Sequence, residues 1–278
     1  MKKITRRSFL AAAGLSVAAL ALTACGGSSS SVASSVASSA SSEAASTSAA
    51  AAELTTVEAG KLTMATNAAF PPYEMTTDAG DIEGIDVETA QAIADKLGLE
   101  LQIDDMDFDA ALLSVQQGKA DIVMAGVTVT DERKAVMDFS DSYATGIQSI
   151  IVPEGSDITS PDDLAGKKIG TQRGTTGYIY CSDDFGDDAV VAYDDGLTAV
   201  QALNNGQVDA VVIDNAPAKE FVAANPGLVI LDTSYAEEDY AIGLAKGSAL
   251  EDAVNAALEE LKADGTLQSI VDKYITAE

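Results

Sequence analysis

Residues 86–103, DVETAQAIADKLGLELQI, carry the pattern that decides the fold. Their apolar residues recur at intervals of three or four: Val87, Ala90, Ile93, Ala94 and Leu97. This spacing predicts an amphipathic helix that Asp86 caps and Gly98 ends. Residues 99–103 then predict a strand, so a helix leads directly into a strand.

The same alternation continues on both sides of this stretch. Upstream, residues 61–66 predict a strand. Downstream, residues 109–117 predict a helix that Gly118 ends, and residues 121–125 predict a further strand. Strands that alternate with helices in this way are typical of a largely parallel sheet covered by helices. The predicted fold class is therefore α/β.

A second series of the same kind follows Ser160-Pro161-Asp162-Asp163, which is a capping box with proline at the first helical position. Its predicted strands are residues 168–172, 190–193, 208–213 and 228–231, alternating with helices at 175–180, 197–205 and 216–224. A returning strand at 241–245 and helices at 248–261 and 266–274 complete the chain. Two sheets of similar size, joined by extended segments, predict two lobes with a cleft between them.

The first 25 residues have the order of an export signal. Four basic residues precede an uncharged run that is too short to predict a membrane span, and Leu22-Thr23-Ala24-Cys25 resembles the lipobox of bacterial lipoproteins. Residues 1–24 are therefore predicted to be a signal peptide, and Cys25 to be lipidated. Two neighbouring arginines suit both the general and the twin-arginine export routes, so the route stays open.

Residues 25–54 are predicted to be the lipidated cysteine and a flexible tether, because most residues of this segment are Ser or Ala. The folded domain is then 55–278.

Composition excludes several classes of function. Without the predicted signal, 12 basic residues face 44 acidic ones, a formal charge of −32, which disfavours binding to nucleic acid or anionic lipid headgroups. The chain has no histidine, which removes the commonest general base and a common zinc ligand. With Cys25 lipidated, Cys181 is the remaining thiol, so no intrachain disulfide is expected. Neither a cofactor nor a metal is predicted, and the acidic runs 183–184 and 187–188 lack the spacing of a calcium loop.

An ordered set of motifs resembles the solute-binding lipoproteins of polar amino-acid ABC importers, the bacterial extracellular solute-binding proteins of family 3. The matching runs are residues 66–74 (TNAAFPPYE), 85–88 (IDVE), 107–110 (DFDA), 118–121 (GKAD), 125–141, 160–166, 174–177 (GTTG), 206–210 (GQVDA) and 264–266 (DGT). They cover nearly all of residues 60–276. The resemblance implies a two-lobed periplasmic-binding-protein-like fold, with lobe 1 at about 60–145 plus 244–278 and lobe 2 at about 149–237. Two crossing strands would form the hinge.

The resemblance also implies a site for the two charged ends of an amino acid. A zwitterion that enters a closed cleft needs a cation for its carboxylate and an anion for its ammonium group. The residues implied for the carboxylate are Arg133, which follows a predicted helix cap at Thr130, with Thr175 and Thr176 at a helix start across the cleft. Those implied for the ammonium group are Asp214, at the end of an apolar strand, with Thr128, Ala125 and Gly126. Arg133 could instead pair with neighbouring acids, and Asp214 or Thr175 could simply cap a helix.

The side-chain pocket implied by the resemblance consists of Asn67, Phe70, Tyr73, Phe108 and Gln172. Relatives that take basic amino acids often carry an acid at the position of Asn67. The amide therefore favours a neutral or polar substrate, whereas a basic substrate stays an alternative because Glu238 or Asp239 could reach the pocket.

The predicted function is a non-catalytic, monomeric receptor that captures an L-amino acid by hinge closure and delivers it to an ABC permease. The predicted location is outside the cytoplasm of a bacterium, with the lipid on Cys25 as the membrane anchor. A dehydratase-like enzyme on the same fold and a sensory ligand-binding domain are the alternatives.

Overall fold

The computed structural model describes residues 54–275. The predicted signal peptide, Cys25 and nearly all of the predicted tether lie outside the described residues. Within residues 54–275, no helix has both the length and the apolar character needed to cross a membrane.

The first helix–strand series forms as predicted, with small shifts at its ends. Its elements are β1 (Lys61–Thr66), α1 (Ile85–Leu97), β5 (Glu100–Asp105), α2 (Phe108–Gln116) and β6 (Ile122–Val123). β1 pairs in parallel with both β5 and β6, which confirms the parallel arrangement. The prediction that Asp86 caps α1 was wrong, because Gly84 is the cap and Asp86 is a fully buried residue of the first turn.

A small antiparallel sheet that the pattern did not predict lies between β1 and α1 in the sequence. It consists of β2 (Ala69–Phe70), β3 (Glu74–Thr76) and β4 (Ile82–Glu83), in the order β2-β3-β4. These strands are only two or three residues long, which is too short for an alternating pattern to be recognised.

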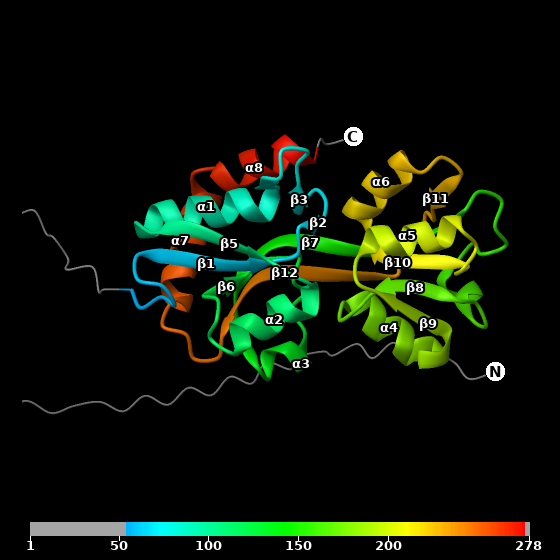
Figure 1. The fold of residues 1–278 in the computed structure, drawn as a ribbon, viewed down its shortest axis with the longest axis horizontal. Helices are drawn as coiled ribbons and strands as arrows, with labels where there is room; N and C mark the ends of the chain where they lie inside the picture. The colour runs from blue at the N-terminus through cyan, green and yellow to red at the C-terminus, as the bar shows by residue number, and fades with distance from the viewer. Residues whose placement is uncertain (1–53, 276–278) are drawn as a thin grey trace, which may run out of the picture. The chain divides into compact units, whose positions relative to one another are not determined.

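Two long strands connect the two helix–strand series. β7 (Met137–Pro153) follows the short helix α3 (Asp131–Lys134), and β12 (Ala236–Ala245) pairs with it in antiparallel register from Ala236 opposite Gln148 to Ala245 opposite Met137. Figure 1 shows these two strands running between the two groups of helices. Because β7 and β12 continue through both series, the expected two sheets are one nine-stranded sheet in the order β5-β1-β6-β12-β7-β10-β8-β9, with β11 on β7.

The second series begins with a short 3₁₀ segment whose capping box, between Ser160 and Asp163, forms as predicted. Its elements are η1 (Pro161–Leu164), β8 (Ile169–Gln172), α4 (Thr176–Phe185), η2 (Asp187–Ala189), β9 (Val190–Tyr193), α5 (Gly196–Asn204), β10 (Ala210–Asp214), α6 (Asn215–Ala224) and β11 (Leu228–Ile230). β8 pairs in parallel with β9 and β10, whereas β10 is antiparallel to β7. The end of β10 therefore lies beside the long strand β7.

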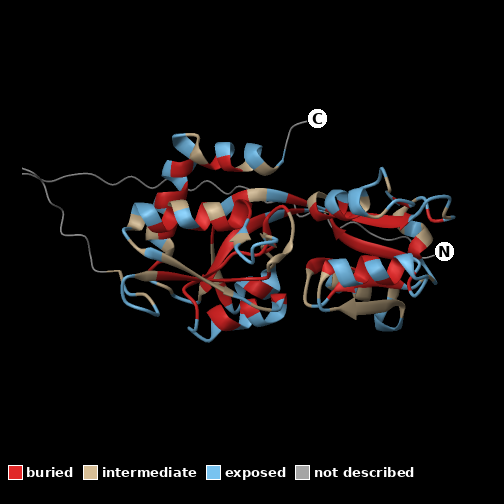
Figure 2. Ribbon diagram, turned by 45° about the horizontal axis from the view of Figure 1, so that its top comes forward, coloured by how far each residue is buried: buried red, intermediate tan, exposed pale blue. Residues whose placement is uncertain are grey.

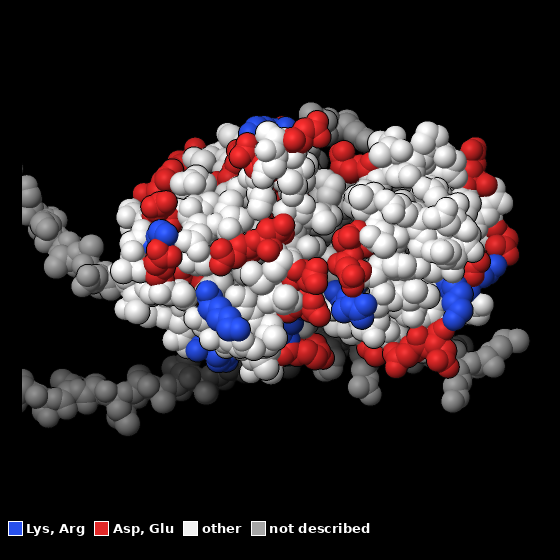
Figure 3. Space-filling model, in the orientation of Figure 1, with Lys and Arg blue, Asp and Glu red and all other residues white. Residues whose placement is uncertain are grey.

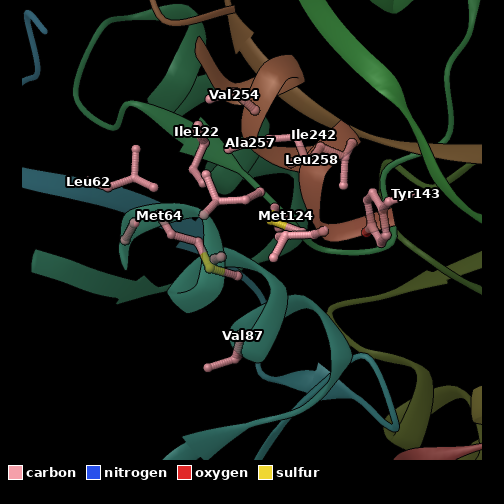
Figure 4. Close-up of a cluster of buried hydrophobic side chains, with 14 of the residues drawn as sticks. Leu62, Met64, Val87, Ile122, Met124, Tyr143, Ile242, Val254, Ala257 and Leu258 are labelled. Atoms are coloured by element: carbon pink, nitrogen blue, oxygen red, sulfur yellow. The ribbon is translucent and has the colours of Figure 1, made fainter. Parts of the chain in front are cut away.

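Two C-terminal helices, α7 (Glu251–Ala263) and α8 (Thr266–Tyr274), return to the first series. Val254, Ala257 and Leu258 of α7 pack in one apolar cluster with Leu62 and Met64 of β1. Figure 4 shows this cluster, and Figure 2 shows buried strands beneath helices whose outer faces are exposed. Separate apolar clusters under α2 and around α4 and α5 complete the core.

Candidate functional site

The pocket that holds most of the predicted site residues lies where the two helix–strand series face each other. About 440 Å³ of this pocket is not filled by protein atoms, and part of that space is open to solvent. The lining residues are Asn67, Phe70, Glu74, Phe108, Ala125, Gly126, Thr128, Arg133, Gln148, Gln172, Thr175, Thr176, Val212, Ile213, Asp214 and Tyr240. The structure therefore brings together every predicted ligand-contacting residue except Tyr73.

Arg133 is a buried cation at the wall of this pocket. Thr130 caps α3 by accepting a hydrogen bond from the Arg133 backbone N–H at 3.2 Å, which places the arginine in the first turn as predicted. Its Nη1 donates to Thr128 O at 2.8 Å and its Nη2 donates to Gly174 O at 3.1 Å. The guanidinium also lies over the Phe108 ring, 5.4 Å from the centroid. Burial lowers the pKa of Arg133, although the negative charge of Glu238 opposes this change.

Backbone carbonyls therefore orient this guanidinium, and the neighbouring acids Asp131 and Glu132 do not compete for it. Both acids are exposed, and neither forms an ion pair with Arg133 among the described residues. A guanidinium has five N–H donors, and the two that bind carbonyls leave others for a ligand. Arg133 can thus offer a carboxylate a charged, preorganised partner.

Thr175 and Thr176 approach Arg133 from the opposite side of the pocket. Thr175 is the N-cap of α4, since its Oγ1 accepts from the Tyr178 backbone N–H at 3.3 Å. Thr176 lies in the first turn of the same helix, and its Oγ1 is 3.4 Å from Thr128 Oγ1. The free backbone N–H groups at the start of a helix attract anions, so this side of the pocket also suits a carboxylate.

Asp214 is a buried acid at the wall of the pocket. It ends β10, its Oδ1 accepts from the Ala216 backbone N–H at 2.9 Å, and its Oδ2 accepts from the Ile147 backbone N–H at 2.8 Å. Burial raises the pKa of Asp214 to about 6, against the lowering effect of these hydrogen bonds. Asp214 therefore caps α6 and also lines the pocket, so its role as a cap does not exclude the predicted contact with a ligand.

The polar side chains of the predicted specificity pocket are bonded to each other. Gln172 Nε2 donates to Asn67 Oδ1 at 2.8 Å, and Asn67 Nδ2 donates to Met106 O at 3.0 Å. Phe70 and Phe108 supply apolar walls. Tyr73 does not line the pocket, because its ring stacks behind Phe70 with centroids 5.6 Å apart.

Sequence reasoning missed three residues with polar groups at this site. Gln148 lies on β7, a strand that the apolar pattern did not predict. Tyr240 lies on β12, of which the pattern predicted only residues 241–245. Both residues line the pocket. Glu74 also lines it, and the only available signal was its place in the run 66–74. Of the two acids left open by the sequence, Glu238 is buried and Asp239 is exposed. Glu238 Oε2 accepts from Thr128 Oγ1 and Gln148 Nε2, both at 3.0 Å.

No group of three or more His, Cys, Asp or Glu side chains is arranged to hold a metal ion in the part of the chain that the structure describes. Cys181 is buried among apolar residues around α4 and forms no disulfide with any residue of 54–275.

The sequence pattern of the bacterial extracellular solute-binding proteins, family 3, matches residues 62–277. The chain belongs to this family. Within family 3, it is 33% identical over 275 residues to the probable histidine-binding protein of Neisseria gonorrhoeae, an alignment that covers 96% of this chain and 95% of the relative.

Two solved structures show the same fold. The arginine-, lysine-, histidine-binding protein ArtJ of Geobacillus stearothermophilus is 35% identical with a TM-score of 0.75, over 78% of this chain and 96% of ArtJ. An ancestral arginine-binding protein bound to glutamine is 41% identical with a TM-score of 0.75, over 78% of this chain and 99% of that protein. The two-lobed α/β fold is therefore confirmed.

Proposed function

We propose that this family 3 protein captures an L-amino acid in the pocket between its two helix–strand series. The observation that carries the proposal is that a buried cation, Arg133, and a buried carboxyl group that accepts two backbone N–H bonds, Asp214, line the same pocket. An isolated buried charge is costly, and a ligand with one charge of each sign would compensate both. An α-amino acid has this pair of charges a short, fixed distance apart.

In this proposal, Arg133 and the α4 N-terminus at Thr175 and Thr176 bind the α-carboxylate. Asp214 binds the ammonium group, with the hydroxyl of Thr128 and the backbone at Ala125 and Gly126 beside it. The amide of Gly126 already donates to Asp86 Oδ2 at 3.0 Å. Its contribution to an ammonium group is therefore the carbonyl oxygen, because ammonium has donors and no acceptor.

The side-chain pocket supports a neutral or polar substrate. Asn67 and Gln172 offer amide groups, and Phe70 and Phe108 offer apolar surface. A buried side-chain ammonium group that met only these residues would lack a counter-ion. The ancestral protein described above holds glutamine, which belongs to this neutral class.

A basic amino acid is the second candidate, and Glu238 is the observation that favours it. The side chain of Glu238 is 6% exposed, and its Oε1 accepts no hydrogen bond from the described residues. If Asp214 neutralises the ligand ammonium group, Glu238 is available to a second cation. ArtJ is described as binding arginine and lysine, which are basic amino acids.

We further propose a role in import rather than catalysis. The matched family consists of solute-binding proteins, so release of an unmodified amino acid to an ABC permease is the step that follows capture. Recovery of unmodified ligand by mass spectrometry after long incubation would support this role. Accumulation of a dehydrated or otherwise altered product would instead support the enzyme alternative.

Membrane attachment through lipid on Cys25 is part of the same proposal. Acyl chains on Cys25 would anchor the protein, because each buried CH₂ contributes about 0.8 kcal/mol. The acidic surface seen in Figure 3 disfavours electrostatic attachment to anionic lipid. Incorporation of labelled palmitate should disappear in Cys25→Ser and persist in Cys181→Ser, and size-exclusion chromatography of the unlipidated domain should give a monomer.

A thermal-shift screen of the twenty amino acids, ornithine, citrulline and cystine tests the function as a whole. A ligand at 100 times its dissociation constant adds about 2.7 kcal/mol of stability, which is a clear increase in Tm. At least one amino acid should produce it, with neutral or polar side chains ahead of arginine and lysine. A screen in which no amino acid raises Tm would contradict the proposed function.

A further inference from the structure

Two fully buried carboxyl side chains, one at the pocket and one behind its wall, have no role in the proposed capture of an amino acid. Glu74, the first residue of β3, and Asp86, in the first turn of α1, are both 0% exposed. Glu74 lines the pocket. Backbone hydrogen bonds hold the two segments together, since the Asp86 N–H donates to Tyr73 O at 2.9 Å.

Asp86 connects the pocket wall to a long strand. Its Oδ2 accepts from the Gly126 backbone N–H at 3.0 Å and from the Tyr143 hydroxyl at 2.7 Å. Gly126 lines the pocket, and Tyr143 belongs to β7, which joins the two helix–strand series. One carboxylate oxygen thus fixes a binding wall to the strand about which the lobes would move.

The carboxyl groups of Glu74 and Asp86 lie close enough for each to change the pKa of the other. No donor group of the described residues reaches Asp86 Oδ1 or either oxygen of Glu74. Because an ionised carboxylate can only accept, a hydrogen bond between two carboxyl groups contains a proton. A proton held between the two groups would supply the donor that these buried oxygens lack.

The surroundings of the two carboxyl groups favour one position for the proton. Burial raises the pKa of Glu74 well above its usual value and raises that of Asp86 to about 6. Asp86 accepts from two donors, which favours its charged form, so the proton belongs on Glu74. Asp105 of β5 adds a further negative charge nearby, and the other titratable groups facing the pair are the phenols of Tyr73 and Tyr143.

We propose that Glu74 and Asp86 form a carboxylic acid–carboxylate pair that retains one proton at neutral pH and positions the Gly126 wall of the pocket against β7. Both are positioning residues. Gly126 has φ +56°, and a Cβ there would lie 2.7 Å from Phe70 Cε1, so this wall tolerates little displacement. The link to ligand affinity rests on the proposed function, whereas the shared proton does not.

The first test measures the proton without any ligand, by urea unfolding from about pH 5 to pH 9. A Glu in the unfolded chain releases its proton near pH 4.5, whereas folded Glu74 retains it. The contribution of Glu74 to the free energy of unfolding is therefore complete below pH 4.5 and decreases as the pH rises. As the pH rises, the unfolding equilibrium constant of the wild type should increase by up to about tenfold per pH unit more than that of Glu74→Gln. Glu83→Gln, an exposed change on the adjacent strand, should follow the wild type. If the free energy of unfolding of the wild type and that of Glu74→Gln depended on pH in the same way, the proposed proton on Glu74 would be contradicted.

Infrared spectroscopy provides the matching signature. The C=O stretching band of a protonated carboxyl group should be present at neutral pH in the wild type and in Glu83→Gln, and absent in Glu74→Gln. An identical band in all three proteins would contradict protonation of Glu74.

The second test measures positioning through affinity for the amino acid found in the screen. Glu74→Gln keeps a donor to Asp86 and should bind within about twofold of the wild type, whereas Asp86→Ala should bind at least about tenfold more weakly. Tyr143→Phe, which removes only the bond to β7, should weaken binding about three- to tenfold. Unchanged affinity in Asp86→Ala and Tyr143→Phe would refute the positioning role. If the wild type bound no amino acid, the proposed function would fail, and the unfolding and infrared results would still decide the pair.

Discussion

Replacement of Arg133 by alanine should nearly abolish amino-acid binding and leave the fold intact. In the structure, the Arg133 guanidinium is buried, donates to Thr128 O at 2.8 Å and Gly174 O at 3.1 Å, and lies over the Phe108 ring. Its loss would leave the ligand carboxylate in the pocket without a counter-ion. Breaking one partner from a buried ion pair costs about 3 to 5 kcal/mol, which is roughly a hundredfold to a few thousandfold in affinity.

Titration calorimetry with the amino acid found in the screen would measure this loss, with circular dichroism as the check on folding. Arg173→Ala is the matched control, because Arg173 is exposed and lies directly before Gly174. Arg173→Ala should bind like the wild type, and Arg133→Lys should recover only part of the affinity because lysine lacks the planar fork. A loss of less than about tenfold in Arg133→Ala would refute the carboxylate assignment.

Further predictions concern the other parts of the pocket. Because the carboxyl group of Asp214 has a pKa raised to about 6 and must be ionised to bind ammonium, affinity should fall below about pH 6 by up to tenfold per pH unit. Titrations at several pH values should show this fall in the wild type, and a pH-independent affinity would argue against Asp214. Asp214→Asn should weaken binding of amino acids. The wild type should also reject analogues that lack the amino group, and equal binding of such an analogue and its parent amino acid would exclude Asp214 as the ammonium partner. Gly174→Ala should weaken binding more than Gly186→Ala. Both glycines have positive φ, but only at Gly174 would an added Cβ lie 3.2 Å from Asp109 Cβ, across the pocket. Equal affinities of the two variants would show that this close approach is unimportant for binding. Asn67→Asp should shift preference toward arginine and lysine by about 1 to 3 kcal/mol in competition binding, and an unchanged preference would remove Asn67 from the side-chain pocket.

Most of the secondary structure could be predicted because the longer helices, such as α1 and α7, have a clear apolar period. The strand at Lys61–Thr66 and the helix at Thr266–Tyr274 match their predicted bounds, and neighbouring elements shift by a few residues. The continuous sheet could not be predicted, because the pairing of β7 with β12 joins segments about a hundred residues apart in the sequence. A local pattern carries no information about such pairing.

The candidate site was predictable in its residues and not in its contacts. The motif run 66–74 pointed to Asn67 and Phe70, which line the pocket. It did not distinguish Tyr73, whose ring stacks on Phe70 away from the pocket, from Glu74, which lines it. Asp86 was interpreted as a helix cap because Asp is common at that position. Its partners, Gly126 and Tyr143, are distant in the sequence, so only the folded chain shows that Asp86 is buried between them.

The most direct test of the central claim is a crystal structure of the protein with the amino acid identified in the screen. We expect the α-carboxylate to lie within hydrogen-bonding distance of the Arg133 guanidinium and the backbone at Thr176, and the ammonium group to contact Asp214. A ligand bound outside this pocket, or bound with its carboxylate directed away from Arg133 and toward Asp214, would contradict the proposed mode of capture.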